Sequence, residues 1–158
     1  MKRRLTPRRT LRRSSASLRA GPVLILPLES HPRSLGDPHH GTTIATVNEL
    51  RIALDQLQQR PPFMLELQAE NGFTLTVGIG GPVSCIQYAS TEGEPPYFVA
   101  MEKSAHLKRK PVIHAFLCGN QNAEISDARC VPFTILRSVA AYFIETGARS
   151  PEVDWVEV

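Results

Sequence analysis

Long hydrophobic runs are absent from this 158-residue chain, since none approaches the roughly 20 apolar residues that a membrane-spanning helix needs. The best candidate, Pro22 to Leu28, is short and interrupted by proline. Cysteine is also scarce: the three cysteines show no CxxC spacing, which argues against a disulfide framework and against a zinc site. We therefore expect a soluble cytoplasmic protein without a cofactor.

Acidic residues are missing from positions 1–20, which hold eight Lys or Arg residues. Residues 21–158 hold ten basic and fifteen acidic side chains, so the net charge of +3 combines a segment of +8 with a remainder of −5. The positive charge thus describes the N-terminus and not a folded nucleic-acid-binding surface.

The same charge asymmetry suggests how the chain is organised. We expect residues 1–40, rich in Arg, Ser and Pro, to form a largely disordered tail, and residues 41–158 to form one domain. Three other interpretations of the tail stay open: a transit peptide, a basic arm that touches nucleic acid, or a start codon assigned too far upstream.

Helix signals occur twice in the sequence. Thr46 and Glu49 have the spacing of a capping box and predict a helix that Pro61 stops. Its apolar face is formed by Val47, Leu50, Leu54 and Leu57. A second helix begins at Pro132 and ends at Gly147.

Alternating apolar residues predict strands over 63–68 and 73–79, joined at Asn71 and Gly72 by a type I′ hairpin turn. Further strands are expected at 83–88, 97–101, 112–118 and 153–158, of which 112–118 is apolar enough to lie centrally. Residues 119–129 resemble a loop, and Trp155 a core residue. The fold class is therefore α+β, with an antiparallel sheet of about five to six strands and two helices packed on one face.

No constellation for catalysis or metal binding emerges. His114 and Cys118 share one face of a strand but lie about 13 Å apart, too far for one ion. The glycines of residues 78–81 are not followed by the Lys-Ser/Thr of a phosphate loop, so they indicate a strand break. Neither Ser84 nor Cys85 lies in a nucleophile-elbow sequence. We expect no catalytic, cofactor-binding or metal-binding residues, and no enzyme.

Several segments together resemble a known family. They are Thr46 to Leu57, the proline pair before Phe63, Leu75 to Gly81, and the ending Ala141 to Val158 with Trp155. In order and spacing they are similar to the first-numbered family of immunity proteins of bacterial polymorphic toxin systems, over residues 43–158. The resemblance implies a cytoplasmic, non-catalytic antitoxin that occludes a cognate toxin, often a nucleic-acid deaminase. The basic N-terminus and the cluster Lys108 to Lys110 depart from a uniformly acidic docking surface.

Acidic residues outnumber basic ones seven to two between Glu49 and Glu102, which suggests a negatively charged face. Enzymes that act on nucleic acids line their clefts with Lys and Arg, so such a face would attract them. We expect the toxin to bind around an acidic loop and its neighbours: Tyr88, Glu92, Glu94, Tyr97 and Glu102. The alternative is a nucleic-acid-binding regulator that uses the basic tail, which deletion of residues 1–40 would disable.

Overall fold

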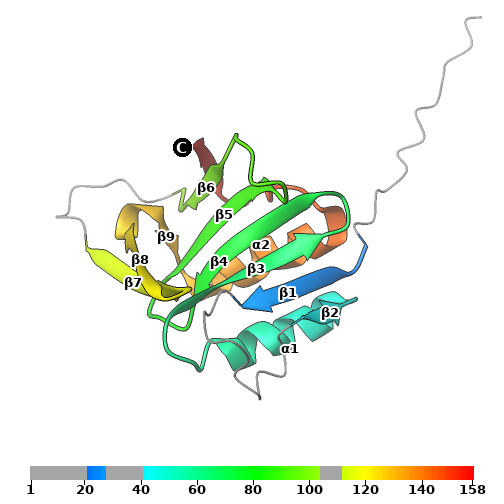
Figure 1. Ribbon diagram of the computed structural model, residues 1–158, viewed down its shortest axis with the longest axis horizontal. Coiled ribbons are helices and arrows are strands. Elements are labelled where there is room, and N and C mark those ends of the chain that lie inside the picture. Colours follow the sequence, from blue (N-terminus) through cyan, green and yellow to red (C-terminus); the bar gives the residue numbers. More distant parts are fainter. Residues whose placement is uncertain (1–20, 28–40, 104–111) are drawn as a thin grey trace, which may run out of the picture.

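The computed structural model describes residues 21–27, 41–103 and 112–158, and its ribbon is drawn in Figure 1. The elements, in chain order, are β1 (Val23–Pro27), β2 (Thr42–Ile44), α1 (Val47–Leu57), β3 (Phe63–Ala69), β4 (Phe73–Ile79), β5 (Ser84–Ser90), β6 (Phe98–Met101), β7 (Ile113–Cys118), β8 (Gln121–Ser126), the 3-10 turn η1 (Asp127–Arg129), β9 (Cys130–Val131), α2 (Phe133–Thr146) and β10 (Asp154–Glu157). Neither helix of the described part is long and apolar enough to cross a membrane.

The sheet follows the order β10-β6-β5-β4-β3-β1-β2, and every pair along this path is antiparallel. β9 adds to β5, and β7 pairs with β8 and, at one parallel position, with β3. The helix α2 lies behind the strands in Figure 1, and α1 lies beside β1 and β2. The α+β prediction is confirmed, with seven strands in the main path where five to six were expected.

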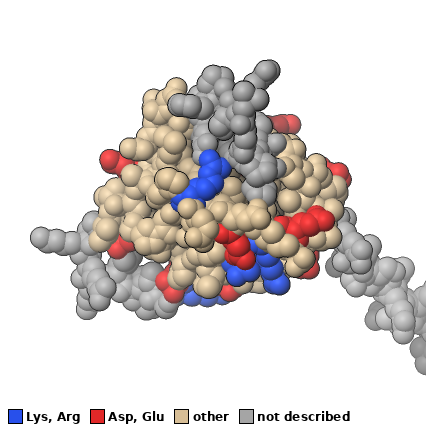
Figure 2. Space-filling model, turned by 90° about the horizontal axis from the view of Figure 1, so that it is seen from below, with Lys and Arg blue, Asp and Glu red and all other residues tan. Residues whose placement is uncertain are grey.

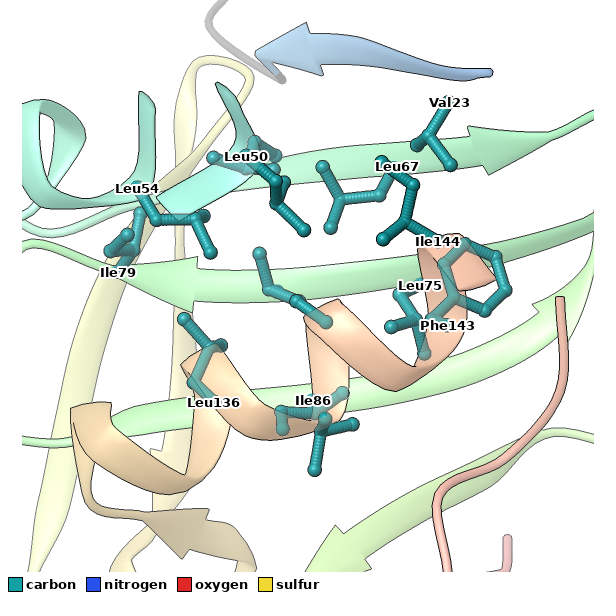
Figure 3. Close-up of a cluster of buried hydrophobic side chains, with 14 of the residues drawn as sticks. Val23, Leu50, Leu54, Leu67, Leu75, Ile79, Ile86, Leu136, Phe143 and Ile144 are labelled. Carbon is teal, nitrogen blue, oxygen red and sulfur yellow. The ribbon is translucent and has the colours of Figure 1, made fainter. Parts of the chain in front are cut away.

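The core follows from the alternation of the strands. Phe63, Leu65 and Leu67 of β3 are buried, and the apolar residues of β4 face the same side. Figure 3 shows how side chains of both helices meet them: Leu50 and Leu54 from α1, and Leu136, Phe143 and Ile144 from α2. This one cluster ties both helices to the sheet. Trp155 packs against its edge, as predicted.

The predicted helix ends are confirmed. The Glu49 N–H donates to Thr46 Oγ1 at 3.2 Å, and the Thr46 N–H donates to Glu49 Oε2 at 3.3 Å, which completes the capping box. Gly147 ends α2 with a φ of 66°, a left-handed conformation that glycine adopts without steric cost.

Strand β1 corrects the expected extent of the tail. Val23 and Ile25 are fully buried, and β1 lies between β3 and β2 in the sheet. The folded region therefore includes residues 23–27, although the sequence composition predicts that they belong to a largely disordered segment. A run of only four apolar residues was too short a signal to predict a sheet strand. The rest of that tail, residues 1–20 and 28–40, lies outside the described residues.

The hairpin between β3 and β4 is confirmed, but its turn differs from the prediction. The Gly72 N–H donates to the Ala69 carbonyl, so Glu70 and Asn71 are the central residues of the turn. Gly72 follows with a φ of 84°. This is a three-residue connection with a left-handed glycine in its last position, instead of a two-residue type I′ turn.

Strands β7 and β8 overturn two further expectations. The segment 112–118 is not central, because Ile113 and Leu117 are exposed and β7 meets β3 at one position only. The expected loop at 119–129 instead contains strand β8, which pairs with β7 along its full length, and the turn η1. Apolar composition predicted the strand β7 correctly but could not say which of its faces is covered.

Candidate protein-binding surface

Two loops meet at one end of the sheet. The Thr91 N–H and Oγ1 both donate to the Gly72 carbonyl, at 2.9 and 3.1 Å, so the loop after β5 is fastened to the turn between β3 and β4. The turn and the loop carry three exposed acidic residues, Glu70, Glu92 and Glu94, and the carboxylate of Glu70 lies against Gly21, just before β1. We call these three residues the acidic end.

The loop of the acidic end is ordered by its own hydrogen bonds. The Gly93 N–H donates to the Ser90 carbonyl at 3.1 Å, and the Glu92 N–H donates to Ser90 Oγ at 3.2 Å. The hydroxyl of Tyr97, a half-buried side chain, donates to the Gly93 carbonyl. Glu92, Glu94 and Tyr97 therefore lie in one loop whose backbone has a fixed shape.

Tyr88 does not belong to this surface. It is 8% exposed, its ring stacks on Phe73 at 5.0 Å, and it meets Phe143 and Trp155 edge to face. Its hydroxyl donates to the Gly147 carbonyl at 3.3 Å. Burial raises the pKa of Tyr88, and the nearby positive charge of Arg149 opposes this effect. Tyr88 is a core residue that anchors the end of α2.

Glu102 is also separated from the acidic end. It follows β6 at the end opposite Tyr97, and five extended residues span about 16 Å. Its neighbour Lys103 donates from Nζ to the Pro151 carbonyl at 2.7 Å. Glu102 therefore lies beside the turn before β10 and not beside Glu92.

Basic side chains partly offset the negative charge of the surface. The guanidinium of Arg149 lies 3.8 Å from the ring centroid of Phe98, which pairs with Tyr88 across the strands. On the face seen in Figure 2, acidic and basic side chains lie next to one another and most of the surface is uncharged. Stretches of the sequence that carry acidic residues without an intervening Lys or Arg include residues 61–102, with Glu92 and Glu94, and residues 150–158.

The hairpin β7–β8 covers the opposite end of the sheet, on the face away from the helices. Phe116 packs there with Met64, Cys85 and Cys130 in a second buried cluster. Gly78 of β4 makes room for it: a Cβ at Gly78 would lie 2.8 Å from Phe116 Cδ1 and 2.6 Å from Cys85 Sγ. From Phe73 to Gly78, β4 spans about 17 Å, which separates this hairpin from the acidic end.

The thiols of this second cluster are not suited to act as nucleophiles. Burial raises the pKa of Cys85 to about 12, helped by Cys130, although a hydrogen bond from the Gly78 backbone opposes it. Burial likewise raises the pKa of Cys130 to about 11, with a further contribution from Asp127. At neutral pH both thiols are protonated and therefore poor nucleophiles.

The glycine-rich stretch after β4 is structural. Gly80 has a φ of 91°, and a Cβ there would lie 2.4 Å from the Arg60 carbonyl oxygen. The side chain of Gln58 accepts from the Gly80 N–H at 3.1 Å and donates to the Gly81 carbonyl at 2.9 Å. The segment closes a turn on the end of α1, in agreement with the predicted strand break. Among the described residues, no group of three or more His, Cys, Asp or Glu side chains is placed to share a metal ion.

Comparison with known sequences identifies the family. The profile of the immunity protein family Imm1 matches residues 38–157, which is most of the chain. The chain belongs to the Imm1 family. No curated protein matches it. Imm1 proteins are non-enzymatic inhibitors of toxins, so this Imm1 protein acts by binding a cognate toxin.

Two features of the Imm1 protein escaped the sequence analysis. Glu70 joins the acidic end through the contact between Thr91 and Gly72, which lie far apart in the sequence and give no local signal. The hairpin β7–β8 did leave a signal, because Ala123 and Ile125 alternate with Asn122, Glu124 and Ser126 after the turn residue Gly119. That alternation predicts a strand with one apolar face.

Proposed function

We propose that the toxin neutralised by this Imm1 protein acts on nucleic acid, for example as a deaminase, and that the acidic end docks on its basic cleft. The observation that carries the proposal is the fastening of Glu92 and Glu94 to the Glu70 turn through Thr91. A loop whose backbone is already ordered loses little backbone freedom on binding. Its exposed carboxylates imitate the charge of phosphates. Tyr97 adds an aromatic contact beside them.

The site of action that we propose is the bacterial cytoplasm. The three cysteines are free, which fits a reducing compartment. A toxin that acts on nucleic acid would also meet its substrate there, so an inhibitor must be present before the damage begins. Electrostatic attraction suits this requirement because it accelerates encounter more than it strengthens the final complex.

Charge reversal tests the docking surface. We expect Glu92→Lys with Glu94→Lys to slow association with the toxin at least about tenfold at low salt. The matched control is Glu152→Lys with Asp154→Lys, which has the same spacing and charge change, with exposed side chains near the other end of β6. The association rate constant, measured by stopped flow or biolayer interferometry, should change little for the control. The difference should shrink at 1 M salt, where the Debye length is about 3 Å. If both pairs of substitutions slow association equally, the acidic end is not the docking surface.

Truncation separates this function from that of a nucleic-acid-binding regulator. Removing residues 1–20 changes the net charge of the chain from +3 to −5, since eight basic residues are lost. We expect faster association with a basic toxin and undiminished protection of cells that express it. Loss of protection after this truncation would favour the regulator.

A further inference from the structure

The outer face of the hairpin β7–β8 is apolar and uncovered. Ile113, Ala115 and Leu117 alternate with the inward-facing Phe116 and Cys118 along β7. Ile113 is 55% exposed, Leu117 is 39% exposed, and Val112 just before the strand is 54% exposed. On β8 the ladder places polar residues across from them: Asn122, Glu124 and Ser126.

This concentration is unusual for a surface of this protein. Seven large apolar side chains are exposed in the described part of the chain, and three of them lie at this hairpin. Of the other four, one lies on α1, one on β4, one on β10 and one just after β10. The edge strand β10 carries Asp154 and Glu157, the kind of charge that protects an exposed strand, whereas β7 carries no acidic or basic residue other than His114. An unprotected apolar strip of this kind is typical of a binding surface.

The inner face makes the outer face rigid. Phe116 is 1% exposed and packs against Met64, Cys85 and Cys130, so β7 is held on the sheet from below. The Leu117 N–H donates to the Pro62 carbonyl at 3.0 Å, and the Asp127 N–H donates to the Val112 carbonyl at 2.8 Å. Both ends of the strip are thereby fixed, which lowers the entropic cost of binding there.

The charge of the strip distinguishes between two occupants. Glu124 stands opposite Ala115 and is the acidic residue of this face. A second copy packed face to face would bury two Glu124 carboxylates, and β7 and β8 carry no Lys or Arg to pair with them. A partner that brings its own basic residue has no such penalty. The toxin of an Imm1 protein is such a partner if, as proposed above, it has a basic cleft.

We propose that the outer face of the hairpin β7–β8 is an apolar anchor for the toxin, which presents apolar side chains to Ile113 and Leu117 and a Lys or Arg to Glu124. The acidic end steers the encounter, and this anchor holds the complex. Tight interfaces centre on buried apolar contacts. The side chains of Ile113 and Leu117 are 55% and 39% exposed and stand on one face of one strand, whereas the acidic end offers Phe73, which is 38% exposed, and the half-buried Tyr97. This inference rests on the proposed function for the basic character of the partner.

The experiment uses the full chain and the purified products of the two open reading frames that flank its gene. We expect Ile113→Ser with Leu117→Ser to raise the Kd for the toxin at least about thirtyfold, which corresponds to about 2 kcal/mol. Ile52→Ser is the matched control, because Ile52 is 51% exposed but lies on α1, and it should change Kd less than about twofold. Glu124→Lys should weaken binding as well. Thermal unfolding checks that the variants stay folded.

The outcomes separate the two proposals. An unchanged Kd for the Ile113 and Leu117 variant overturns the anchor, while a slow association of the Glu92 and Glu94 variant still supports the acidic end. The anchor is also overturned if sedimentation shows a wild-type dimer that the same double substitution dissociates. Failure of the wild-type protein to bind either product contradicts both proposals.

Discussion

A methyl group at Gly78 should push the hairpin β7–β8 away from the sheet. The Cβ of Gly78→Ala would lie 2.6 Å from Cys85 Sγ and 2.8 Å from Phe116 Cδ1. Carbon atoms in contact prefer about 3.5–4.0 Å, so both neighbours must retreat by nearly 1 Å. Cys85 has little room to move, because it is buried on β5, and we expect Phe116 and its strand to shift.

The magnitude follows from two opposing effects. Overpacking of a buried site costs about 1–3 kcal/mol. Replacing glycine by alanine inside a strand recovers about 0.5–1 kcal/mol of conformational entropy. The midpoints of these two ranges give a net loss in the free energy of unfolding of about 1 kcal/mol, measured by urea denaturation with an unchanged m-value. Because Leu117 follows Phe116, toxin binding should weaken too.

A double-mutant cycle tests the cause. Phe116→Leu removes the ring atoms that meet the new methyl group, so it should cost less in the Gly78→Ala background than in the wild type. We expect a coupling free energy above about 0.5 kcal/mol. Strict additivity, or an unchanged stability of Gly78→Ala, would refute the packing argument.

Three other substitutions or reactions test the fold. Thr46→Ala removes the acceptor of the Glu49 N–H and should lower the free energy of unfolding by about 1 kcal/mol in urea denaturation; an unchanged value would argue against the capping box. Tyr88→Ala should lower the free energy of unfolding by about 3–5 kcal/mol. Tyr88→Phe should lower it by about 1 kcal/mol and leave the Kd for the toxin unchanged. A weaker complex with Tyr88→Phe would indicate that Tyr88 contacts the toxin. Cys85, with a pKa of about 12, should resist iodoacetamide at pH 8 in the folded protein and react in guanidinium; mass spectrometry that finds it alkylated in the folded state would contradict its burial.

Local signals predicted most of the fold. The capping box at Thr46, the alternation in β3 and β4, and Gly147 after α2 each depend on neighbours within a few residues, and all three were confirmed. The strand β1 was missed because its stability comes from β3, which lies some forty residues later in the chain. Deletion of residues 1–40, suggested by the sequence, would remove this buried strand, so truncation after residue 20 is the sound experiment.

The structure brings together only some of the five residues that the sequence grouped as one surface. Glu92, Glu94 and Tyr97 lie in one loop, and a short segment is enough to place them together. Tyr88 and Glu102 were grouped with them by proximity in sequence, but the direction of a strand side chain sends Tyr88 into the core, and the length of β6 carries Glu102 away.

This Imm1 protein inhibits its toxin by binding it in a stoichiometric complex. Isothermal titration calorimetry of the purified full chain with the products of the two flanking open reading frames, together with an assay of the toxin's activity, measures this stoichiometry. We expect a 1:1 complex with one of these products and loss of its activity in proportion to the inhibitor added. Binding to neither product, or inactivation of the toxin by substoichiometric amounts of this protein, would contradict it.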